Sequence, residues 1–132
     1  MAIKKITAVL FAEEIEPCVQ FWVERLGFTK VVEVPEGDKL GFAMLQKSGV
    51  ELMYQSYESA RKDVPALAEL VRRGPTFVYV EVENLDETIK ALEGAEVVIP
   101  VRTTFYGARE IGVKDPAGHM VTFAQFGAST QQ

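Results

Sequence analysis

Residues 78–89, VYVEVENLDETI, repeat the pattern of residues 8–19, AVLFAEEIEPCV, at an offset of 70 positions. The matched pairs are Val78 with Ala8, Val80 with Leu10, Val82 with Ala12, Glu83 with Glu13, Leu85 with Ile15, and Ile89 with Val19. The apolar first half of each copy predicts a buried strand, and the helical spacing that follows predicts an amphipathic helix. Self-similarity at a fixed offset indicates that one structural unit occurs twice in the chain.

The elements around the two copies repeat in the same order. In the first copy we predict a strand over residues 3–12, a helix ending at Gly27, and strands over 28–34, 40–46 and 50–55. In the second copy we predict a strand over 76–83, a helix ending at Gly94, and strands over 95–101, 109–114 and 120–126. Chance matching of amphipathic patterns could produce six matched positions, but the repeated order of elements argues against it.

A different segment joins the two copies. Asp63 is a candidate N-cap with Pro65 in the first helical turn, and Gly74-Pro75 is a stop signal, so a helix is predicted between them. The 132-residue chain is therefore expected to be a single domain, with module one over residues 1–57, a linker helix over 58–75 and module two over 76–130.

The predicted fold class is α+β, built from two β-α-β-β-β modules with curved mixed sheets. One helix can cover only one face of each sheet, which leaves the other face apolar and uncovered. We expect these concave faces to enclose a cavity, with every second strand residue lining it. The modules could pair within one chain or across a dimer, because both arrangements use the same elements.

Composition excludes several classes of function. The net charge is −5, from 19 acidic and 14 basic residues, which disfavours nucleic acid as a partner. No run of about 18 apolar residues is present, so no membrane span is expected. The first residues enter a strand pattern at once, without a signal peptide, and Cys18 is the only cysteine, so a cytoplasmic location without disulfides is expected.

Four motifs carry a resemblance to a known family. They are Phe21-Trp22 with Leu26-Gly27-Phe28, Gly49-Val50-Glu51-Leu52-Met53, Tyr106-Gly107-Ala108-Arg109-Glu110, and Asp115-Pro116-Ala117-Gly118-His119. Their order and spacing resemble the vicinal oxygen chelate superfamily over nearly the whole chain. That superfamily includes glyoxalase I, extradiol dioxygenases, fosfomycin-resistance enzymes and bleomycin-resistance proteins. The resemblance implies paired modules, a central cavity and a homodimer.

The resemblance also implies where a metal would be bound in the enzymes of this superfamily. Its four ligand positions correspond to Thr7, Glu51, Phe77 and Thr122, of which only Glu51 is a usual ligand type. The chain has one histidine and one cysteine, so a histidine-rich site is excluded within a protomer, while an all-carboxylate magnesium or calcium site stays open. We therefore expect no metal, no cofactor and no catalytic residue.

Aromatic and methionine side chains dominate the strand positions that could face inward, and such side chains suit a planar apolar ligand. The residues expected to bind the ligand are Glu51, Phe42, Met53, Phe77, Tyr79, Phe105, Tyr106, Arg109 and Thr122, and Phe11, Met44 and Met120 could also face inward. The alternative is that these residues fill a closed core.

Three polar residues have alternative interpretations. A carboxylate among aromatic rings should have a raised pKa, so Glu51 could act as a general base or pair with a cationic ligand. Alternatively, Glu51 forms a structural hydrogen bond with Tyr54, Tyr79 or Thr122, or is partly exposed. Arg109 could anchor an anionic ligand, or it could pair with Glu110 or another surface acid. His119 is expected to stabilise a turn or to face solvent.

These observations predict a metal-free protein, similar to the bleomycin-resistance proteins, that sequesters an aromatic small molecule which can be cationic. Such a protein would act in antibiotic resistance. One alternative is a lyase, isomerase or dioxygenase of the same superfamily. Another is an interaction protein whose cavity is filled and whose homodimer surface carries the function.

Overall fold

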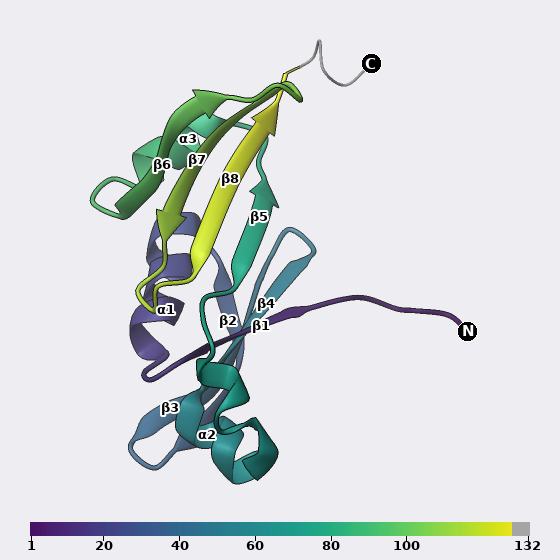
Figure 1. Cartoon of the computed structure of the whole chain (residues 1–132), viewed down its shortest axis with the longest axis vertical. Coiled ribbons are helices and arrows are strands. Elements are labelled where there is room, and N and C mark those ends of the chain that lie inside the picture. The colour runs from purple at the N-terminus through teal and green to yellow at the C-terminus, as the bar shows by residue number, and fades with distance from the viewer. Residues whose placement is uncertain (128–132) are drawn as a thin grey trace. The chain divides into compact units, whose positions relative to one another are not determined.

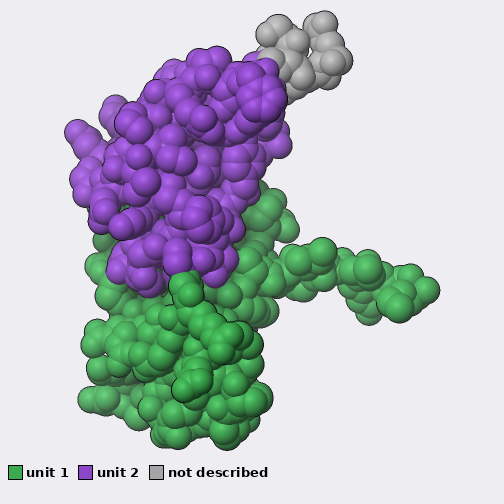
Figure 2. Space-filling model, viewed as in Figure 1, with its two compact units in different colours: residues 1–74 green, residues 75–132 purple. Residues whose placement is uncertain are grey.

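The computed structural model of the chain describes residues 1–127. The chain divides into two compact units, residues 1–74 and residues 75–132, which Figure 2 shows in different colours. Each unit contains one four-stranded mixed sheet (Figure 1). The predicted α+β class and the two β-α-β-β-β modules are therefore confirmed, while the cavity between the modules stays a prediction. The predicted end of module two, at residue 130, lies outside the described residues.

The first sheet has the strand order β1-β4-β3-β2, in which β1 and β4 run parallel and the other pairs antiparallel. Its strands are β1 (Ala8–Ala12), β2 (Thr29–Glu36), β3 (Lys39–Lys47) and β4 (Val50–Ser56). β1 begins five residues later than predicted. In the register of this pair Ala8 is opposite Leu52, so β4, which starts at Val50, offers no partner to residues 3–5.

A helical segment covers one face of the first sheet. It consists of α1 (Glu16–Gln20), which continues directly into the π-helical turn η1 (Phe21–Arg25). Phe21 and Trp22 are buried, and the segment ends near Gly27, whose φ of 75° is one that glycine adopts without steric cost. The predicted helix and its stop at Gly27 are confirmed.

The segment that joins the two units differs from the prediction. The helix α2 (Tyr57–Asp63) ends at Asp63, the residue predicted to begin it. Ser56 is the N-cap, because its hydroxyl accepts a 3.1 Å hydrogen bond from the Ser59 amide. Val64 precedes Pro65 and is extended, so the chain continues only as the 3-10 turns η2 (Pro65–Leu67) and η3 (Leu70–Arg72).

The second sheet repeats the first, with the strand order β5-β8-β7-β6 and β5 parallel to β8. Its strands are β5 (Phe77–Glu81), β6 (Glu96–Thr103), β7 (Ala108–Lys114) and β8 (Met120–Phe126). The helix α3 (Leu85–Ala91) packs against β7 and β8 (Figure 1). Its N-cap is Asn84, whose side-chain oxygen accepts a 3.1 Å hydrogen bond from the Glu87 amide.

The edge strands β2 and β6 occupy equivalent places in the two sheets. Each contains a proline, Pro35 in β2 and Pro100 in β6. The strand pairing shifts register between Val34 and Pro35, and again between Ile99 and Arg102. None of the helices within residues 1–127 has the length and apolar composition that crossing a lipid bilayer requires.

Candidate functional site

Each sheet has a helix face and an opposite face, called here the open face. On the central strands β3 and β4 of the first sheet, the helix face is buried and includes Leu45, Leu52 and Tyr54. Strand alternation places Phe42, Met44, Glu51 and Met53 on the open face, where they are only partly buried. Three of the predicted site residues, Phe42, Glu51 and Met53, therefore share one face.

Glu51 is held by three neighbours on the first sheet. The Lys5 ammonium contacts both carboxylate oxygens, at 3.0 Å for Oε1 and 2.8 Å for Oε2. The Thr7 hydroxyl donates a 2.9 Å hydrogen bond to Oε2, and the Gln46 amide donates a 2.8 Å hydrogen bond to Oε1. The hydrogen bonds from Lys5, Gln46 and Thr7 lower the pKa of Glu51 to about 2.

The expectation of a raised pKa for Glu51 was therefore wrong. That expectation treated the carboxylate as poorly solvated and overlooked the donors that converge on it. An acid with a pKa of about 2 is a weak base near neutral pH. Its charge is also already balanced by Lys5.

The open face of the second sheet carries exposed aromatic rings. On β5, Phe77 is 76% exposed and Tyr79 is 52% exposed. The strand register places Tyr79 opposite Thr122, and Glu81 opposite Ala124. Ala124 in turn lies opposite Glu110 on β7. These residues therefore lie on one face, with a small alanine at its centre.

Glu110 is the centre of a hydrogen-bonded cluster on this face. Tyr79 and Tyr106 both donate hydrogen bonds to its Oε2, and Arg102 Nη2 donates a 3.1 Å hydrogen bond to its Oε1. The Glu110 side chain is only 1% exposed, and the side chains that donate to it come from β5, from β6 and from the turn before β7.

The protonation states of this cluster favour binding over proton transfer. Burial would raise the pKa of Glu110, but hydrogen bonds from Tyr106, Tyr79 and Arg102 outweigh it and hold that pKa below its ordinary value. Burial and the hydrogen bond to Glu110 raise the pKa of Tyr79 well above its ordinary value. Near neutral pH the carboxylate is therefore ionised and the phenol neutral, so neither is ready to exchange a proton.

Two further rings lie beside Tyr106. Phe105 is fully exposed and its ring centroid lies 5.1 Å from that of Tyr106, in an edge-to-face arrangement. The ring of Phe126 is 6.4 Å from Tyr106 on the strand β8. The predicted residues Phe105 and Tyr106 are thus in contact with each other, and Tyr106 is joined to Tyr79 through Glu110.

Sequence reasoning missed Glu110 and Arg102. A signal for Glu110 was available in the alternation of β7, because residue 110 shares a face with Gly112, opposite to Ile111 and Val113. The same alternation places Arg109 on the helix face. There Arg109 Nη2 donates a 3.0 Å hydrogen bond to Oδ1 of Asp86 on α3, so Arg109 and Glu110 do not pair.

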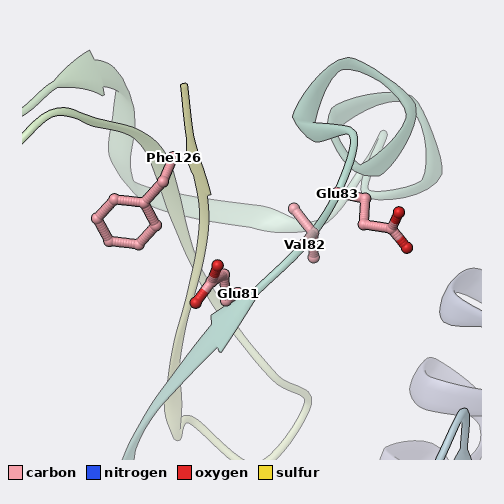
Figure 3. Close-up of a pocket in the computed structure, with 4 residues that line it drawn as sticks. All are labelled: Glu81, Val82, Glu83 and Phe126. Atoms are coloured by element: carbon pink, nitrogen blue, oxygen red, sulfur yellow. The ribbon is translucent and has the colours of Figure 1, made fainter. Parts of the chain in front are cut away.

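A hollow of about 350 Å³ lies where β5 and β8 end, lined by Glu81, Val82, Glu83 and Phe126 (Figure 3). Glu81 and Phe126 extend to the same side of β5, whereas Glu83 points to the other side (Figure 3). Apart from Phe126, the hollow has no aromatic wall, and none of the predicted site residues lines it.

The residues at the four expected metal-ligand positions do not fit a divalent ion. The Thr7 hydroxyl donates its proton to Glu51, whose carboxylate is bound by Lys5, and Phe77 has no lone pair to offer. Within the described chain, no three His, Cys, Asp or Glu side chains are placed to hold a metal. His119 is buried, and its Nδ1 accepts a 2.8 Å hydrogen bond from the Thr76 amide, so it supports the start of β5 and does not face solvent.

Comparisons place this geometry among known proteins. The model of the Glyoxalase/Bleomycin resistance protein/Dioxygenase superfamily matches residues 4–123. No curated protein sequence matches the chain. Among solved structures, the bleomycin-binding protein of Streptomyces verticillus, complexed with copper(II)-bleomycin, is 25% identical with a TM-score of 0.64, over 96% of this chain and 98% of that chain.

Two other solved structures differ from each other in function. The antibiotic binding protein TnmS3 from Streptomyces sp. CB03234 is 17% identical with a TM-score of 0.71, over 96% of this chain and 99% of that chain. A lactoylglutathione lyase from Agrobacterium tumefaciens is also 17% identical, with a TM-score of 0.73, over 94% of this chain and 95% of that chain. At these identities the likeness shows the fold alone.

Proposed function

Because the chain belongs to the Glyoxalase/Bleomycin resistance protein/Dioxygenase superfamily, we propose that it is a metal-free binding member that sequesters an aromatic small molecule. The observation that carries the proposal is the open face of the second sheet, where Phe77, Tyr79 and Tyr106 are 76%, 52% and 42% exposed. Exposed aromatic rings on a folded sheet leave apolar area in water, which a flat ligand would cover.

The charged groups on the open faces also favour binding over catalysis. Glu51 and Glu110 are both ionised and both paired, with Lys5 and Arg102 respectively. A general base would need a pKa near the working pH, and the pKa values of both acids are lowered instead. Bleomycin-binding proteins are among the structures with this fold, which supports a sequestering role.

The proposal allows a ligand with a positive charge. The net charge of −5 favours cations in general, and Glu81 has no ion-pair partner among residues 1–127. Glu51 and Glu110, in contrast, already have cationic partners within the chain. The charge of the ligand is therefore a separate variable in the experiment that follows.

The test is ligand binding to the purified full-length chain, measured by calorimetry and by thermal shift. The probes are metal-free bleomycin, copper(II)-bleomycin, and two flat three-ring compounds, neutral acridine and the N-methylacridinium cation. We expect at least one probe to bind and to raise the Tm, as ligand linkage requires. Phe77→Ala should weaken binding by about 1 kcal/mol, or roughly fivefold in Kd.

The matched control is Val50→Ala, since Val50 is an exposed apolar residue on the first sheet. Its affinity for every probe should equal that of the unchanged chain. If no probe gives heat or a Tm shift, the binding proposal is wrong.

A metal assay separates binding from the enzymatic alternative. After incubation with nickel, zinc and manganese salts followed by desalting, we expect much less than one metal ion per chain. Stoichiometric retention that Glu51→Gln abolishes would instead support a lyase, isomerase or dioxygenase.

We also propose that the protein is a homodimer in the cytoplasm. Ile3 and Ile6, which precede β1, are strongly exposed apolar residues, and burial against a second copy would remove them from water. Light scattering coupled to gel filtration should give twice the mass of one chain. A monomeric mass at micromolar concentration would contradict the dimer.

A further inference from the structure

Two tyrosines on the second sheet are fixed by one carboxylate. Tyr79 belongs to β5 and Tyr106 to the turn between β6 and β7, yet both hydroxyls donate to Oε2 of Glu110. We call Tyr79, Tyr106 and Glu110 the tyrosine clamp. Hydrogen bonds to an ionised acceptor are roughly twice as strong as neutral ones, so both rings are held firmly by their outer ends.

In the clamp the two tyrosine rings are exposed to solvent, whereas the carboxylate of Glu110 is buried. Glu110 is 1% exposed, whereas Tyr79 and Tyr106 are 52% and 42% exposed. An exposed tyrosine ordinarily samples several rotamers, and a ligand that stacks on it reduces this conformational entropy, which weakens binding. Rings that are already fixed avoid this ordering cost, which makes the surface preorganised for a flat ligand.

Arg102 completes the polar part of the clamp. Its Nη2 donates to Oε1 of Glu110, and within residues 1–127 this is its one hydrogen bond. A guanidinium has five N–H donors, and the Arg102 side chain is 54% exposed, so several donors face solvent beside the tyrosine rings. A guanidinium offers donors only, so its natural partner on a ligand is an acceptor oxygen.

The charge balance at the clamp disfavours a cationic partner. The carboxylate of Glu110 is paired with Arg102, so the clamp itself presents no free negative charge. The nearby unpaired acid, Glu81, lies toward the hollow at the end of β5 and β8, whereas Arg102 binds Glu110 directly. A ligand cation placed against the clamp would approach the guanidinium and be repelled by it. A neutral carbonyl oxygen would instead accept a charge-assisted hydrogen bond from Arg102.

We infer that the clamp, together with Arg102, recognises a flat, uncharged aromatic compound that carries a ring carbonyl. The inference rests on the proposed binding function and deepens it by naming the ligand class and the residues that select it. Tyr79 and Tyr106 contact the ligand rings, Arg102 binds the carbonyl oxygen, and Glu110 is a positioning residue.

Three probes with the same three-ring frame test this inference. Acridone carries a ring carbonyl, acridine lacks it, and N-methylacridinium is a cation without it. For the unchanged chain we expect acridone to bind about tenfold more tightly than acridine, because a hydrogen bond to a charged donor discriminates by that order. N-methylacridinium should bind most weakly.

Variants separate the two roles. Arg102→Met keeps the length and the apolar stem of the side chain but removes every N–H donor, while Tyr79 and Tyr106 still donate to Glu110. It should lower the ratio of the acridine Kd to the acridone Kd from about ten to about three or less, with little change in the Kd of acridine. Tyr79→Phe and Tyr106→Phe keep the aromatic rings but remove the hydroxyls that hold them to Glu110. Each should weaken the binding of acridone and of acridine by the same factor of about three. Tyr57→Phe, on α2, is the matched control and should change nothing.

The results distinguish failure of this inference from failure of the proposed function. If the unchanged chain binds bleomycin or acridine but shows no preference for acridone, the inference is wrong and the binding function stands. Tightest binding of N-methylacridinium, or an acridone preference that survives in Arg102→Met, would also overturn it. If no aromatic probe binds at all, the proposed function itself fails.

Discussion

The indole Nε1 of Trp22 donates a 2.8 Å hydrogen bond to the phenol oxygen of Tyr54. Trp22 lies in η1 and Tyr54 on the helix face of β4, and both are buried. The hydrogen bond therefore connects the helical segment to the centre of the first sheet.

The first prediction concerns this hydrogen bond. Tyr54→Phe removes the phenol oxygen that accepts from a buried indole N–H, so it should lower the free energy of unfolding by about 1–3 kcal/mol. Urea unfolding can be followed by the fluorescence of Trp22, the only tryptophan. The control is Tyr57→Phe, because the ring of Tyr57 keeps its contact with Arg72, and it should change stability by less than about 0.5 kcal/mol. Equal stabilities of the two variants would contradict the prediction.

The second prediction concerns acid stability. The pKa of Glu51 is about 2 in the folded chain, below the ordinary value of 4.5, so the folded state binds this proton less tightly than the unfolded state does. The contribution of Glu51 to stability is therefore present above about pH 4.5 and is lost as the pH falls toward 2. Glu51→Gln should flatten the fall of the urea midpoint over this range.

Glu69→Gln serves as the control for acid stability, because Glu69 is exposed and makes no ion pair within residues 1–127. It should show the same pH dependence as the unchanged chain. An identical slope for Glu51→Gln would mean that the contacts with Lys5, Gln46 and Thr7 do not persist in solution.

The third prediction separates Arg109 from the binding surface. Arg109 pairs with Asp86 on the helix face, and both side chains are substantially exposed. Arg109→Gln should leave the affinity for acridine and acridone unchanged and lower stability by at most about 1 kcal/mol. The stability difference should shrink in high salt, because exposed ion pairs are screened. A clear loss of affinity for the probes would place Arg109 in the site after all.

The fourth prediction concerns the support of β5. His119 Nδ1 accepts a hydrogen bond from the Thr76 amide, next to the first residue of β5. An asparagine places its Oδ1 close to the position of that nitrogen, whereas alanine offers no acceptor. His119→Ala should lower the free energy of unfolding by about 1–3 kcal/mol, and His119→Asn should recover most of that loss. If His119→Ala and His119→Asn lowered the free energy of unfolding equally, the hydrogen bond to the Thr76 amide would not be the source of the stability that His119 contributes.

The repeat could be predicted from the sequence because strand and helix periodicities survive in both copies. Alternation at Val78 and Val80, which are half-buried, indicates from local sequence alone which side of β5 faces the protein interior. The linker helix was misplaced because Ser56 and Asp63 are both capable N-caps, and only the first is followed by a full turn free of proline. Local sequence does not state which of two caps a helix uses.

The clamp could be predicted only in part. Tyr79 and Tyr106 were expected to be site residues because aromatic side chains at inward strand positions suit a ligand. Glu110 could not be predicted in this way, because it lies on β7, which carries none of the four positions that correspond to metal ligands. That one oxygen of Glu110 joins two tyrosines 27 positions apart in sequence follows from strand pairing, which periodicity does not reveal.

The prolines in the edge strands have a consequence for behaviour at high concentration. An uninterrupted edge presents a row of amide and carbonyl groups on which further chains can assemble into fibrils. Pro35 and Pro100 each lack an amide hydrogen, and each lies at a shift in strand pairing. The row of backbone groups is therefore interrupted near the end of β2 and in the middle of β6. In each of the two sheets, one of the two edges is thus made unsuitable for amyloid-like growth.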